Sequence, residues 1–120
     1  MAAQGVRPYQ NDNAKDWFWT TLSPVADEID EVLARAITQD NYDAYRAVAW
    51  LLIKIGRDGV YPTARLTTHL SDIHDRLQDI KDDNGYLATW QSPTEFVKDL
   101  DDLIVQLQRV CKWNNVTVTF

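Results

Sequence analysis

Residues 63–82, TARLTTHLSDIHDRLQDIKD, carry the clearest helical pattern in the chain and indicate its fold class. Its aliphatic residues alternate steps of four and three, which places them on one side of an α-helix: Leu66, Leu70, Ile73, Leu77 and Ile80. The opposite side carries aspartates at similar spacing: Asp72, Asp75, Asp79 and Asp82. A helix with one apolar stripe and one charged side packs on other helices through its stripe. The stretch therefore predicts one member of a helical bundle.

The rest of the chain predicts four more helices around this one. Apolar residues recur at helical spacing in 24–38 and 93–112, and residues 41–55 are apolar nearly all round. Ser23 followed by Pro24 is typical of a helix start, so a separate short helix is expected before it. The sequence predicts a single all-α domain spanning 1–120, a compact bundle in which 41–55 is the central helix. The expected helices are 12–22, 24–38, 41–55, 63–82 and 93–112.

Composition restricts the classes of partner. The formal net charge of −6 repels phosphate backbones, which argues against direct binding of nucleic acid. The single cysteine, Cys111, cannot form an internal disulfide, and residues 1–5 do not have the pattern of a signal peptide. The longest apolar stretch, residues 47–53, is far too short to span a membrane. We therefore expect an acidic, soluble, cytoplasmic protein.

Residues 4–17, QGVRPYQNDNAKDW, carry the most specific motif in the chain. They resemble an uncharacterised family of small bacterial and phage proteins, which open with Trp-Gly, an aromatic residue, and Glu-Asn-Asp-x-Ala-x-Asp-Trp at the start of the first helix. Gln4 and Gln10 stand where that family has Trp and Glu. The resemblance implies an all-α fold and no particular activity. The matching positions are Gly5, Tyr9, Asn11, Asp12, Ala14, Asp16 and Trp17.

Within this motif, three polar residues can accept hydrogen bonds from backbone N–H groups at a helix start: Asn11, Asp12 and Asn13. We interpret them as a structural N-cap motif. A ligand site at the helix N-terminus is the alternative.

Two pairs of carboxylates have the spacing of a possible metal site: Glu28 with Glu31, and Asp72 with Asp75. All-α nucleotide pyrophosphohydrolases hold Mg²⁺ with such pairs on facing helices, because hard cations need several carboxylate oxygens. Both pairs here turn away from the apolar faces of their helices, whereas a metal site in a bundle core needs inward carboxylates. We therefore expect solvated surfaces, with no metal or cofactor, and keep the Mg²⁺-dependent hydrolase as an alternative.

The remaining reactive side chains do not form a catalytic pattern. His69 and His74 are five residues apart, about 140° around a helix, so they cannot ligate one metal together. Each flanks the apolar stripe and is expected at the boundary of the core. Cys111 falls on the buried face of 93–112 and is expected to pack in the core. No catalytic residue is assigned.

Aromatic residues are the best candidates for a binding surface. Residues 17–19, Trp-Phe-Trp, spread over about 200° of a helix, so they cannot all face one core. We expect at least one of them to be part-exposed, and Trp19 is the first candidate. Residues 116–120 alternate as a short extended segment, which needs a pairing partner in this chain or another. The candidate interface residues are Trp17, Trp19, Tyr86, Trp90, Val118 and Phe120.

Together these observations favour a small protein-interaction module whose partner is another protein. A stoichiometric inhibitor, or an immunity-type or anti-defence-type protein of bacterial or phage origin, is one concrete form of that function. The alternatives are the hydrolase, with Glu28, Glu31, Asp72 and Asp75 as its ligands, and an oligomeric sponge for a small ligand. Self-association remains open.

Overall fold

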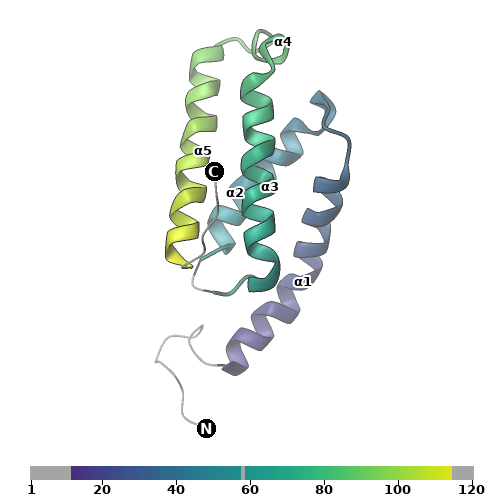
Figure 1. Ribbon diagram of the computed structural model, residues 1–120, viewed down its shortest axis with the longest axis vertical. Helices are drawn as coiled ribbons and strands as arrows, with labels where there is room; N and C mark the ends of the chain where they lie inside the picture. Colours follow the sequence, from purple (N-terminus) through teal and green to yellow (C-terminus); the bar gives the residue numbers. More distant parts are fainter. Residues whose placement is uncertain (1–11, 58, 115–120) are drawn as a thin grey trace.

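The computed structural model describes residues 12–57 and 59–114, and its regular structure within these ranges is entirely helical (Figure 1). The predicted all-α fold of about five helices is confirmed. Val118, Phe120 and the expected extended segment lie outside the described residues, as does Asn11. The elements are α1 (Asp12–Ala34), a 3-10 turn η1 (Gln39–Asn41), α2 (Tyr42–Ile55), α3 (Thr63–Asp82), α4 (Asn84–Leu87) and α5 (Pro93–Trp113).

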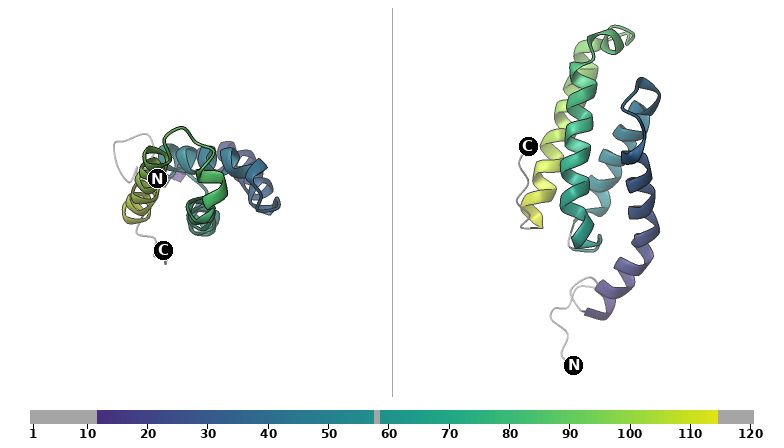
Figure 2. Two further views of the ribbon diagram at one scale, coloured as in Figure 1. Left: turned by 90° about the horizontal axis from the view of Figure 1, so that it is seen from above. Right: turned by 45° about the vertical axis from the view of Figure 1, so that its right-hand side comes forward.

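Three helices, α5, α3 and α1, lie side by side, and α2 crosses behind them (Figures 1 and 2). The aliphatic stripe of α3 is fully buried, as its spacing predicts. α2 packs against all three neighbours, but only through its inner side. Its outer side is open, and Trp50 remains 56% exposed there. α2 therefore contacts every long helix, as a central helix should, but it is covered from one side only although its sequence is apolar nearly all round.

α1 is one continuous helix where two were predicted. Pro24 lies inside it and not at a helix start. Proline removes a backbone donor and crowds the preceding turn, which accounts for the bend along α1 in Figure 2. The hydroxyl of Ser23 donates to the Trp19 carbonyl (2.6 Å) in this weakened turn. Ala26 and Ile29, just beyond the proline, are buried in the core, so packing holds the helix together across it.

α1 also ends at Ala34, four residues earlier than predicted. The amide of Asn41 donates to the Ala36 carbonyl (2.8 Å), and the Tyr45 hydroxyl donates to the same oxygen (3.3 Å). These two side chains bond the Ala36 carbonyl, which a continuing helix would bond with a backbone N–H, and the chain turns towards α2. The connector before α5 contains a short helix that was not predicted, α4, capped by the Asp83 carboxylate, which accepts from the Tyr86 N–H (3.0 Å).

α2 and α5 run beside each other in the same direction, which positions the surface described below. At one end Arg46 of α2 faces Asp99 of α5. At the other end Gly56, just after α2, packs so closely that a Cβ there would lie 3.0 Å from Cγ1 of Val110. The Asn114 amide donates to the Gly56 carbonyl (2.5 Å) and fixes this end. None of the described helices combines the length and the hydropathy needed to cross a membrane.

Candidate protein-binding surface

Both tryptophans near the start of α1 are exposed, and each also contacts another residue. Trp19 is 37% exposed, and its indole N–H donates to the Gly59 carbonyl in the α2–α3 loop (2.9 Å). Trp17 is 62% exposed and contacts Phe18 edge-on, with ring centroids 5.2 Å apart. Trp19 is thus part-exposed, as predicted, although the loop contact holds its ring and Trp17 is the more exposed of the two. Asp12 and Asn13, of the expected cap motif, are exposed in the first turn of α1.

Tyr86 and Trp90, predicted as interface candidates, do come together at the start of α5. The Trp90 ring stacks on Phe96 with centroids 4.1 Å apart and planes 14° apart. Tyr86 meets both rings edge-on, at 5.9 Å from Phe96 and 6.3 Å from Trp90. A shallow notch of about 290 Å³ opens beside these rings, and we call it the Trp90 notch. It is lined by Trp90, Gln91, Ser92, Glu95 and Phe96.

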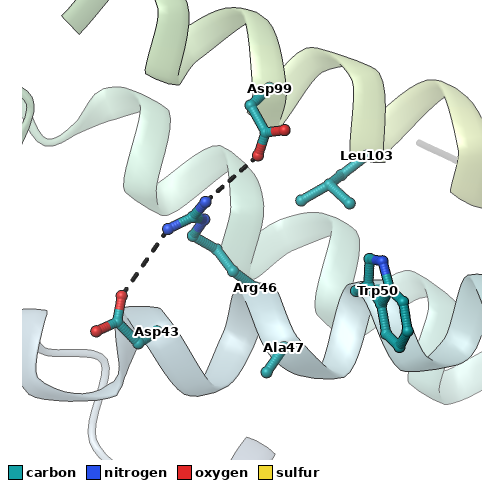
Figure 3. A pocket seen from close by; sticks show the side chains of 6 residues that line it. All are labelled: Asp43, Arg46, Ala47, Trp50, Asp99 and Leu103. Carbon is teal, nitrogen blue, oxygen red and sulfur yellow. Dashed lines mark hydrogen bonds and ion pairs between the residues drawn. The ribbon is translucent and has the colours of Figure 1, made fainter. Parts of the chain in front are cut away.

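Arg46 of α2 lies against this aromatic stack. Its guanidinium is 4.6 Å from the Phe96 centroid and 5.5 Å from the Trp90 centroid. Its ion pairs are long, at 3.4 Å to Asp99 and 3.9 Å to Asp43, whereas charge-assisted hydrogen bonds measure about 2.7–2.9 Å (Figure 3). Its Nε atom is buried without a hydrogen-bond partner among the described residues. The guanidinium is therefore held in position by the rings while its hydrogen-bonding capacity is poorly used.

A second hollow, of about 440 Å³, lies between α2 and α5 and is open to solvent. Figure 3 shows Arg46 reaching across it from α2 towards Asp99, with the Trp50 ring standing beside Leu103. Asp43 and Ala47 complete its lining. We call it the Trp50 hollow. Arg46 borders both hollows, because it lines this one and packs on the rings that line the Trp90 notch.

A cation lies over each of three exposed tryptophans, Trp50 in α2, Trp90 in the connector before α5, and Trp113 at the end of α5. Arg46 covers Trp90, Lys54 lies 5.2 Å from the Trp50 centroid, and Arg57 lies 4.2 Å from the Trp113 centroid. Sequence reasoning missed Trp50 and Trp113. For Trp50 the exposed residues that flank the apolar run, Asp43 and Lys54, lie at helical spacing on the same side of α2, although the run between them has no periodicity of its own.

A second polar cluster, which the sequence did not predict, joins α1 to α3. His69 Nε2 lies 2.6 Å from the Asp30 carboxylate, and His69 Nδ1 lies 2.6 Å from the Tyr61 hydroxyl. Arg65 pairs with Asp27 (2.8 Å) and with Asp30. A carboxylate only accepts, so Nε2 donates to Asp30, and the Tyr61 hydroxyl is the hydrogen-bond partner of Nδ1. The hydrogen bond from His69 lowers the pKa of Asp30, and burial raises the pKa of Tyr61.

This cluster resembles an acid–histidine–hydroxyl relay, but its hydroxyl cannot meet a substrate. Tyr61 is fully buried and His69 is 1% exposed. A relay nucleophile has to reach the reacting carbonyl or phosphoryl group. The cluster is therefore a structural tie between α1, the α2–α3 loop and α3. The expectation that His69 and His74 lie at the boundary of the core is wrong, since both are buried.

The other predicted chemical groups stay apart. Glu28, Glu31 and Asp75 are exposed, and Asp72 is half-buried. Within residues 12–57 and 59–114, no three histidine, cysteine or carboxylate side chains are grouped so that they could hold a metal. Cys111 is buried in the core, and burial raises the pKa of its thiol.

Because the comparisons with known proteins found no match, the function has to be argued from the surface itself. The chain matches no protein-family model, no curated protein and no solved structure. Of the features described above, the Trp90 notch is the one that joins an exposed aromatic stack to a positioned and poorly paired cation.

Proposed function

We propose that the protein is a small protein-interaction module that binds another protein at the Trp90 notch. The observation that carries this proposal is Arg46, stacked on Phe96 and Trp90 with long ion pairs on either side. Tryptophan, tyrosine and arginine dominate the binding energy of protein interfaces. Because the rings already hold Arg46 in place, a partner loses little affinity to side-chain ordering.

The chemistry of the notch selects a partner with an acidic residue next to an apolar one. A carboxylate can bind the planar guanidinium of Arg46 through two parallel hydrogen bonds. It would replace the long pairs with Asp99 and Asp43, whose exposed side chains can turn to water. The neighbouring apolar side chain would pack on Trp90 in the notch of about 290 Å³.

Within this class we propose a stoichiometric inhibitor, or an immunity-type or anti-defence-type protein, acting in the cytoplasm. The small size, the net charge of −6 and the single cysteine support this role. The resemblance of residues 4–17 to small bacterial and phage proteins is a further, associational support. The Mg²⁺-dependent hydrolase receives no such support, because its four acids do not gather among the described residues.

Selection of a random displayed peptide library on the immobilised protein tests the proposed site. We expect enriched peptides with Asp or Glu beside an aromatic or aliphatic residue. Trp90→Ala should abolish their binding, and Arg46→Lys should weaken it, because lysine keeps the charge but loses the planar fork. Trp113→Ala is the matched control, since it removes another exposed tryptophan at the opposite end of α5. Peptides that bind equally well to Trp90→Ala, or that are basic, would refute the proposal.

A further inference from the structure

The outer side of α2 carries a stripe of four exposed residues, Asp43, Ala47, Trp50 and Lys54. Steps of four, three and four place them on one line along the helix. Trp50 is more than half exposed in the middle of a helix whose other side packs on three neighbours. Such a ring at the centre of a helix face marks an interaction surface that residues 12–57 and 59–114 do not cover. We call these four residues the Trp50 stripe.

The order of the Trp50 stripe along α2 is anion, small residue, large residue, cation. When two copies of α2 lie antiparallel, Asp43 of each copy meets Lys54 of the other, and Ala47 of each meets Trp50 of the other. This is the reciprocal pairing that a two-fold symmetric interface requires. We propose that the Trp50 stripe binds a second copy of this chain and forms an antiparallel two-fold dimer.

The shape of the stripe agrees with this pairing. Ala47 and Trp50 line the open Trp50 hollow of about 440 Å³, and Ala47 contributes only a methyl group. The Trp50 ring of the second copy can therefore lie over Ala47 without displacing backbone. A parallel arrangement would instead oppose Asp43 to Asp43 and Lys54 to Lys54, which destabilises a contact between like charges.

The charges at both ends of the stripe are available for a second copy. The Asp43 side chain is 87% exposed, and its pair with Arg46 is 3.9 Å long. Lys54 is exposed and lies over the ring of its own Trp50, 5.2 Å from the centroid. Each dimer would gain two Asp43–Lys54 pairs by symmetry. These pairs fix the register, and the two Trp50 rings supply most of the buried apolar area.

The expected dimer is weak. An interface built on one helix face lies near the lower limit of about 1,000 Å² that specific association needs, so we expect a dissociation constant on the order of micromolar. The dimer goes beyond the proposed function, because it uses the Trp50 stripe and not the Trp90 notch.

Sedimentation equilibrium over protein concentrations from about 1 µM to about 1 mM tests the dimer. We expect a monomer–dimer equilibrium in the wild type. Ala47→Glu should give a monomer at every concentration, because it places a buried charge and added bulk under the Trp50 ring of the second copy twice in each dimer. Ala64→Glu, which introduces the same residue at an exposed position on α3, should leave the equilibrium unchanged. Circular dichroism checks that both variants keep their helices.

Charge reversal distinguishes the antiparallel register from any other contact. Asp43→Lys alone and Lys54→Asp alone should each weaken the dimer by at least about tenfold, because each opposes like charges twice. An equimolar mixture of the two variants should form a heterodimer, since the opposed positions are again complementary. A wild type that stays monomeric, a dimer that tolerates Ala47→Glu, or a mixture that fails to associate would each overturn the proposal. Trp90→Ala should leave the dimer intact, so this result is independent of peptide binding at the notch.

Discussion

The buried bond between Tyr61 and His69 makes Tyr61→Phe a direct test of how the fold is held together. The hydroxyl lies 2.6 Å from Nδ1, and water reaches neither residue to any useful extent. Removing the hydroxyl leaves the buried Nδ1 atom unpaired, which destabilises the fold by about 1–3 kcal/mol. Tyr42→Phe is the matched control. Tyr42 is also buried, but its hydroxyl donates to the Asp83 carboxylate (2.8 Å), which keeps its bond from the Tyr86 N–H and meets solvent.

Urea unfolding followed by circular dichroism measures both variants. For Tyr61→Phe we expect the free energy of unfolding to fall by about 2 kcal/mol, with an unchanged urea dependence. For a chain of this length that corresponds to a decrease in Tm of roughly 8 °C. Tyr42→Phe should lose about 1 kcal/mol or less, because its former partner is not left buried and unpaired. An equal loss in both variants, or a larger loss in Tyr42→Phe, would refute the view that the His69 cluster ties α1 to α3.

Four further outcomes follow from the structure. Folding lowers the pKa of the Asp30 carboxyl, because the carboxylate accepts a hydrogen bond from His69. The stability that this bond contributes is present above the unfolded carboxyl pKa near 4 and is lost as pH falls through the lower folded pKa. Asp30→Asn should therefore flatten the acid side of a pH–stability curve measured by urea unfolding. Gly56→Ala should destabilise the fold by about 1–3 kcal/mol in the same assay, because its Cβ would clash with the Leu52 carbonyl oxygen, whereas Gly85→Ala, with its nearest neighbour at 3.6 Å, should not. Pro24→Ala should raise the melting temperature by restoring a donor inside α1, and a lower value would mean that the bend is needed for packing. Calorimetric titration with Mg²⁺ should show no site tighter than about millimolar, and a tighter site lost in Glu28→Ala would favour the hydrolase.

The parts of the fold that the sequence predicts are those set by neighbours three or four residues away. The burial of the aliphatic stripe of α3 follows from spacing alone, and α3 begins and ends where predicted. Pro24 is the exception among the local signals. Its sequence context favours a new helix, but the burial of Ala26 and Ile29 against α2 and α3 keeps α1 continuous. A local preference of this size is easily outweighed by tertiary packing.

The sequence predicted residues of the candidate surface only where they lie outside the long helices. Tyr86 and Trp90 stood out because they fall in a connector, but nothing local indicated that Arg46, more than forty residues before Trp90, would lie over the Trp90 ring. Trp50 was missed for the opposite reason. Residues 47–53 are apolar at every position, so periodicity cannot tell which side of the helix the neighbours cover. His69 was placed at a boundary because its partners, Asp30 and Tyr61, are brought together only by the packing of α1 on α3.

The cations beside the exposed tryptophans bear on the selectivity of both proposed contacts. An indole face open to water is attractive to any apolar surface, so Trp50, Trp90 and Trp113 without their cations would favour non-specific association. A cation over the ring keeps charge and bound water at that face. An apolar partner therefore has to displace the cation and its water before it can bind the ring. A partner that brings a carboxylate avoids this loss, because the cation exchanges its ring contact for an ion pair. At Trp90 that carboxylate would belong to another protein, and at Trp50 it would be Asp43 of a second copy. The pairing of each ring with Arg46 or Lys54 thus discriminates against apolar surfaces in general and in favour of acidic ones.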